Sequence, residues 1–222
     1  MNSKTRKLAI TSLLAALTFL LGLTLIGYPP NPLLPVFSLT LMCLPVIIGT
    51  IVEGLKTGLL LSLVFGITSY LKAIGFTLVP DALGTLLLGI NALKTLIVIF
   101  IPRLLIPVTT WFVYKAITGE SKIRQRVATG VASFVGSITN TVLFLGAVYL
   151  LFLPEVGEIS GFLAPLGSIV GFEITTDTLF SVYAFLGAIN GLPEAIVAVL
   201  LCVPIVWALT KSKNKRFKKT EN

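Results

Sequence analysis

The sequence predicts an all-α integral membrane protein with six transmembrane helices and both termini in the cytoplasm. Of the 222 residues, 55% are hydrophobic and only 12% are charged, whereas a soluble domain carries about 25% charged residues. A membrane span needs about 20 mostly apolar residues, and several such stretches follow one another along the chain. The basic residues also gather in alternate connections, as the topology of membrane proteins requires.

The first two helices are expected over 6–27 and 38–52, because residues 8–52 contain no charged side chain. The basic start also fits a signal peptide, but no polar domain follows it, so we expect a retained helix. The connection between the two helices begins at Tyr28 and holds four prolines, which prevent a continuous helix. It is either a stiff lid over a pocket or an ordinary connection.

The remaining helices are expected over 56–75, 86–117, 127–153 and 178–210, within a single domain that comprises residues 1–222. A turn marked by Pro80 and Asp81 separates the first pair of these helices, and an acidic connection precedes the last one. We find no internal repeat along the chain.

The charges orient the six spans. With the N-terminus in the cytoplasm, all of the 17 basic residues face the cytoplasm except Lys72, Lys94 and Arg103. Five acidic residues then fall on outer loops, namely Asp81, Glu155, Glu158, Glu173 and Asp177. This distribution satisfies the positive-inside rule. The net charge of +8 is therefore attributed to topology and anionic lipid, and no nucleic-acid partner is expected.

Several functional classes are disfavoured by what the sequence lacks. There is no G-x-x-x-x-G-K-[S/T] phosphate loop, so any ATP hydrolysis belongs to another polypeptide. The chain has no histidine, which removes the commonest metal ligand and general base. Cys43 and Cys202 lie in apolar runs and are interpreted as small buried hydrophobic residues. We therefore expect no catalytic residue, no metal and no cofactor.

Polar residues within the last span indicate a binding pocket. Tyr183, Gly187, Asn190 and Glu194 have the spacing i, i+4, i+7 and i+11, which places them on one face of a helix. Pro193 cannot donate a backbone hydrogen bond and should loosen the helix beside Glu194. Because polar groups are costly inside a membrane, this face predicts a pocket for a small solute.

Asn140 is the corresponding candidate in the fifth span. It follows a stripe of small residues, Ala132 and Gly136, which allow close helix packing. Its side chain is expected either to contact a ligand or to make a hydrogen bond between helices.

Two cations in the fourth span are candidates for binding an acidic group. Lys94 and Arg103 are nine residues apart, which is about 900° of rotation, so they point to opposite faces unless Pro102 re-aims one of them. Lys94 either faces the pocket or extends to the outer interface. Arg103 either pairs with Glu194 or holds the carboxylate of an acidic substrate.

These features together resemble the substrate-binding S components of energy-coupling factor (ECF) transporters. The similarity is carried by four segments: 7–17, 44–49 (LPVIIG), 136–143 (GSITNTVL) and 190–196 (NGLPEAI). The last two look most like the pantothenate-specific branch. The resemblance implies a vitamin site near the outer face, and transport driven by a coupling protein (EcfT) and two ATPase subunits (EcfA and EcfA′).

The resemblance also suggests roles for individual residues. A small-residue stripe on the first helix would either dock on EcfT or pack within the chain: Thr11, Ser12, Ala15 and Ala16. Pantothenate is a monoanion with two hydroxyls and an amide. A site for it would use Lys94 or Arg103 with neutral groups, namely Asn140, Asn190, Thr139 and Tyr183, below a connection that starts at Tyr28.

Glu194 fits the pantothenate interpretation least well, because a second carboxylate beside an anion is unfavourable. It would accept hydrogen bonds from hydroxyls or hold Arg103 in place. Three alternatives stay open: another vitamin of the folate, cobalamin or pyridoxine class, a self-sufficient carrier that uses Glu194 as a proton site, and a structural subunit or enzyme. The lack of an internal repeat argues against a carrier.

Overall fold

The computed structural model describes residues 3–30, 38–78, 81–155, 157, 159, 161, 163 and 176–220. These residues form helices, and the one strand-like pairing among them joins Pro30 to Ser38. The elements are α1 (Ser3–Leu23), η1 (Leu25–Gly27), α2 (Cys43–Glu53), α3 (Leu55–Ala73), α4 (Ala82–Ile90), α5 (Ala92–Ile117), α6 (Lys122–Leu151), η2 (Leu153–Glu155), α8 (Thr176–Leu186), η3 (Gly187–Gly191) and α9 (Leu192–Thr220).

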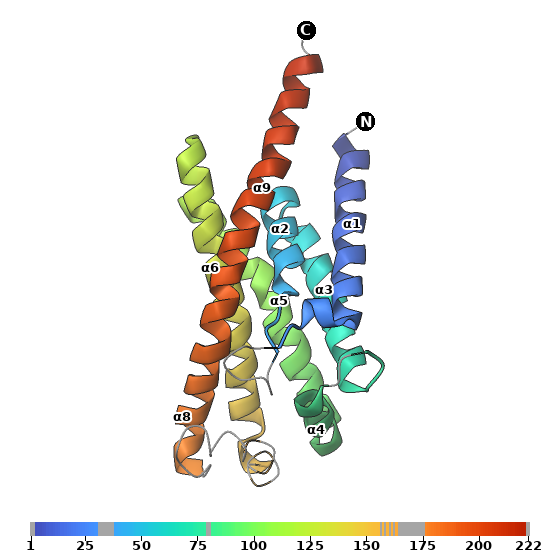
Figure 1. Cartoon of the computed structure of the whole chain (residues 1–222), viewed down its shortest axis with the longest axis vertical. Helices are drawn as coiled ribbons and strands as arrows, with labels where there is room; N and C mark the ends of the chain where they lie inside the picture. The colour runs from blue at the N-terminus through green and yellow to red at the C-terminus, as the bar shows by residue number, and fades with distance from the viewer. Residues whose placement is uncertain are drawn as a thin grey trace.

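The long helices run along one axis of an elongated bundle (Figure 1). α1 and α6 begin, and α9 ends, at the same end of the bundle, which we call the basic end because Lys4, Lys122 and Lys211 lie there. α4 and α8 lie at the opposite end, which we call the distal end. α6 packs against both α5 and α9.

Four helical stretches are long and apolar enough to cross a membrane: Lys4–Leu23, Ala92–Ile117, Lys122–Leu151 and Thr178–Lys211. α2 is also apolar but has only 11 residues. Leucines project outward from the bundle, among them Leu13, Leu93 and Leu200, which are 65% to 71% exposed. Such an apolar exterior is expected of a protein that is surrounded by lipid.

The helix predicted over 86–117 is interrupted. Asn91 has extended backbone angles and ends α4, and its side-chain oxygen then accepts a 3.0 Å hydrogen bond from the Lys94 amide at the start of α5. Asp81 caps α4 in the same way through the Gly84 amide at 2.9 Å. Because an Asn or Asp cap satisfies amides that the first helical turn leaves free, each of these residues starts a new helix. α4 is thereby a separate short helix at the distal end.

The buried side chains form two clusters. One surrounds α2 and contains Met42, Ile47 and Phe65, together with Cys43 and Cys202, so both cysteines are buried as predicted. The other lies at the distal end and contains Leu87, Val98, Phe152 and Leu179.

The connection between α1 and α2 contains a short ribbon, which comprises residues 27–30 and 38–41. The Leu39 amide donates to the carbonyl of Pro29 at 2.8 Å, and the Leu41 amide donates to the carbonyl of Gly27 at 3.0 Å. Most of the predicted proline-rich segment, 31–37, lies outside the described residues, as do Glu158 and Glu173.

Candidate substrate-binding site

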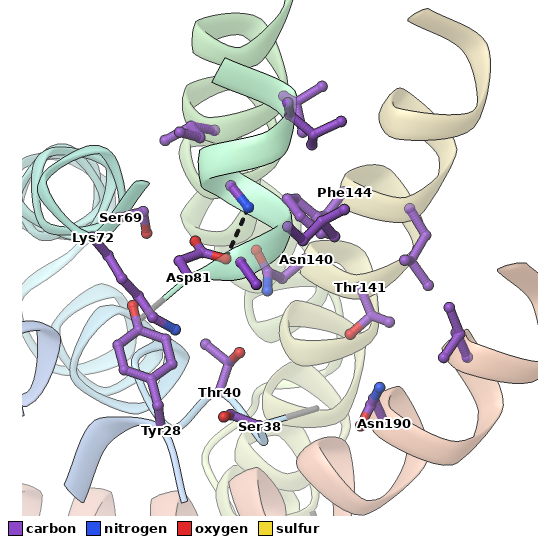
Figure 2. Close-up of a pocket in the computed structure, with 18 of the residues that line it drawn as sticks. Tyr28, Ser38, Thr40, Ser69, Lys72, Asp81, Asn140, Thr141, Phe144 and Asn190 are labelled. Carbon is purple, nitrogen blue, oxygen red and sulfur yellow. Dashed lines mark hydrogen bonds between the residues drawn. The ribbon is translucent and has the colours of Figure 1, made fainter. Parts of the chain in front are cut away.

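A cavity of about 350 Å³ lies between the middle and the distal end of the bundle, and the ribbon, α3, α4, α5, α6, α8 and α9 contribute its walls. Of the eight residues predicted to bind substrate, six line this cavity: Tyr28, Arg103, Asn140, Tyr183, Asn190 and Glu194. Figure 2 shows Asn140 and Thr141 projecting from one helix while Tyr28 and Lys72 lie on the opposite side. A cavity of this size suits a small solute.

Arg103 is the cation of α5 that reaches the cavity. Its side chain is 9% exposed, and Nη1 donates to the carbonyl of Val98 at 2.9 Å. The guanidinium lies 4.7 Å from the ring centre of Phe144 and 5.4 Å from that of Phe65. Among the described residues, Arg103 has no ion pair and its Nε has no hydrogen-bond partner. Of the two arrangements considered for Arg103, the pair with Glu194 is therefore not formed.

Glu194 is buried and makes its hydrogen bonds to residues other than Arg103. One carboxylate oxygen accepts from the backbone amide of Thr40 at 2.6 Å, and the other accepts from the Thr141 hydroxyl at 3.4 Å. The helix before it contains the π-helical turn η3, just ahead of Pro193. Because this turn holds one extra residue, Glu194 is rotated by about 100° from where a continuous helix would place it relative to Tyr183.

Asn140 offers a second unsatisfied group. The side chain is 6% exposed, and its carbonyl oxygen has no hydrogen-bond partner among the described residues. A buried amide in this state costs free energy unless something bonds to it. Arg103 and Asn140 both line the cavity, and each holds a buried polar atom that has no partner among the described residues.

Lys72 is a cavity residue that the pocket prediction missed. Its ammonium lies 3.6 Å from the ring centre of Tyr28, and the side chain is 8% exposed. Its signal was present in the sequence, because Lys72 is one of the three basic residues that break the positive-inside pattern. Burial raises the pKa of the Tyr28 phenol to about 12, so this hydroxyl keeps its proton at neutral pH.

Two predicted site residues lie outside the cavity. The Lys94 ammonium pairs with Glu155 at 2.7 Å and lies 5.5 Å from the ring centre of Phe152. The Thr139 hydroxyl donates to the carbonyl of Val135 at 2.7 Å, within its own helix. Of the two cations in the predicted fourth span, the structure brings only Arg103 to the cavity.

The family model for the "ECF transporter, substrate-specific component" matches residues 6–206. The chain belongs to this family of S components. It is also 33% identical to the pantothenic acid transporter PanT of Lactococcus lactis subsp. cremoris (strain MG1363), over 96% of this chain and 98% of that protein. The resemblance found in the sequence is therefore confirmed, and the family is one of transporter substrate-binding components rather than enzymes.

In this S component, the small-residue stripe of α1 divides between two environments. Thr11 and Ala15 are half-buried, and Ala15 packs against the core cluster around α2. Ser12 and Ala16 are exposed, next to the outward-facing Leu13. One half of the stripe thus packs within the chain, and the other half is accessible to a partner.

Proposed function

We propose that this chain is the high-affinity substrate-binding subunit of an ECF-type importer and that its vitamin is pantothenate. As a single domain in the bacterial plasma membrane, it crosses the bilayer six times with the basic end in the cytoplasm. Four long apolar helices, the 11-residue α2 and the 19-residue α3 supply the crossings. The cavity then opens towards the outer face, where a scavenged solute arrives.

The observation that carries the proposal is the unpaired Arg103 in the cavity wall. A buried guanidinium without a carboxylate partner is costly unless an anion joins it, and its planar fork matches a carboxylate. Asn140 adds an unsatisfied amide in the same cavity. Together they favour a small solute that has one carboxylate and several neutral polar groups.

Pantothenate has this composition. We assign its carboxylate to Arg103, and its amide and hydroxyls to Asn140, Asn190 and Tyr183, which lie along the cavity. Glu194 accepts from Thr40 and Thr141, and we assign it no hydrogen bond to the ligand carboxylate. The similarity to PanT favours the same ligand.

Transport requires partners. We propose that EcfT and the two ATPase subunits EcfA and EcfA′ supply coupling and energy, and that EcfT contacts α1 through Ser12 and Ala16. These two small residues are exposed beside large apolar neighbours, which lets another membrane helix approach closely.

The test is calorimetric titration of a vitamin panel into the purified chain in detergent. Nanomolar binding of pantothenate that is lost in Asn140→Ala or Asn190→Ala supports the proposal. Tight binding of another vitamin keeps the S-component function but replaces the ligand. If no vitamin binds and the chain alone supports uptake that an uncoupler abolishes, the proposal fails in favour of a self-sufficient carrier.

A further inference from the structure

We infer that Glu194 is a positioning residue, which shapes the cavity by holding the ribbon. The inference starts from the 2.6 Å hydrogen bond in which the Thr40 backbone amide donates to Glu194, 154 residues further along the chain. A short bond from an amide to a carboxylate is charge-assisted and among the stronger kinds.

The ribbon's geometry explains why Thr40 needs an outside acceptor. In an extended segment, successive amides point to opposite sides. The amides of Leu39 and Leu41 donate to the other half of the ribbon, to the carbonyls of Pro29 and Gly27. The Thr40 amide between them therefore points away from the ribbon, where the Glu194 carboxylate accepts its hydrogen bond.

The held segment is part of the cavity wall. Tyr28, Ser38 and Thr40 all line the cavity, and Figure 2 shows them together on one side of it. From α3, Lys72 contacts the Tyr28 ring at 3.6 Å. The ribbon is thus fixed by a cation on one helix and by the Glu194 carboxylate on another.

Both Glu194 oxygens have protein partners, and no described cation forms an ion pair with it. Each oxygen accepts one hydrogen bond from the protein, and these two bonds hold the carboxylate in the orientation that fixes the ribbon. The ribbon requires an acceptor at this position, and the negative charge strengthens the bond. Glutamine keeps an acceptor oxygen in the same place, whereas alanine removes it.

The experiment is hydrogen–deuterium exchange of residues 38–42 in the full-length, ligand-free chain in detergent. Glu194→Ala is expected to speed exchange of the Thr40 amide by about 10- to 100-fold, because it loses a charge-assisted bond. Glu194→Gln should give an intermediate exchange rate, clearly slower than Glu194→Ala, since an amide oxygen still accepts but carries no charge. The matched control is Glu155→Gln, which alters a carboxylate outside the cavity and should leave exchange at 38–42 unchanged.

Pantothenate titration of the same variants measures the consequence for ligand binding. Only this second measurement rests on the proposed function, and the exchange measurement does not. Affinity should fall about 10- to 100-fold in Glu194→Ala and be partly restored in Glu194→Gln, in step with exchange. Unchanged exchange in Glu194→Ala, or equally fast exchange in Glu194→Gln, overturns the inference. If exchange responds as expected but no variant binds pantothenate, the ligand assignment fails and the role of Glu194 in holding the ribbon stands.

Discussion

Replacing Arg103 by glutamine tests the charge pairing at the centre of the proposed site. Arg103 is buried, is held by one hydrogen bond to Val98, and has an unpartnered Nε. Because no described carboxylate forms an ion pair with it, the substitution strands no buried anion, and the fold is expected to persist. The variant therefore reports on the ligand.

The magnitude follows from the bonds that a carboxylate would make. Two hydrogen bonds to a charged group contribute about 1.5 kcal/mol or more each, so about 3 kcal/mol depends on the carboxylate. This corresponds to an affinity difference of about 100-fold between pantothenate and pantothenyl alcohol, in which a hydroxymethyl group replaces the carboxylate. In Arg103→Gln we expect this difference to shrink to about threefold or less.

The assay is calorimetric titration of both ligands into the natural chain and the variant, with size-exclusion chromatography as a check of folding. Lys94→Gln is the matched control, because Lys94 pairs with Glu155 outside the cavity. It should preserve the preference for pantothenate. If Arg103→Gln weakens both ligands equally, Arg103 supports the structure and does not bind the carboxylate, and the reasoning is refuted.

Three further predictions concern other contacts. Asn140→Asp should weaken pantothenate binding more than Asn140→Ala, since it puts a second negative charge beside the anion; calorimetry showing equal or tighter binding to the aspartate variant would contradict this. Tyr28→Leu removes the ring under Lys72, a contact worth about 0.5–2 kcal/mol, and should weaken pantothenate binding by roughly two- to thirtyfold. Tyr28→Phe keeps the ring and should bind pantothenate like the natural chain. Equal losses of affinity in both variants would count against the ring contact. Ala16→Leu, on the exposed face of α1, should leave pantothenate binding unchanged and reduce co-purification with the coupling protein, so unimpaired co-purification would remove this face from the interface.

The sequence predicted the helices wherever length, hydrophobicity and proline decide them. The expected span 127–153 corresponds to α6, and 56–75 corresponds to α3. The break within 86–117 was missed because most of the stretch is apolar and Asn91 looks like one more scattered polar residue. Its capping hydrogen bond to the next helix is the deciding contact, and an asparagine ahead of a helical pattern was the available signal.

The site residues that recur along one helix face were predicted from their spacing. Contacts between segments that are distant in the sequence were predicted less well. Asn190 and Glu194 share a helix, and both line the cavity. The partner of Glu194 could not be predicted, because it is the backbone amide of Thr40, and an amide has no residue-type signature. The one-face argument also assumed a continuous helix, whereas the π-helical turn re-aims Glu194.

The charges of the cavity are compatible with the anionic ligand that we propose. Two carboxylates and two cations line it, yet no ion pair joins them in the described structure. Asp81 and Glu194 accept from backbone amides, whereas Lys72 and Arg103 lie against aromatic rings. A ligand carboxylate would therefore gain a cation without first breaking an ion pair. This makes Arg103 the residue whose loss should change which ligand is preferred, in addition to how tightly it binds.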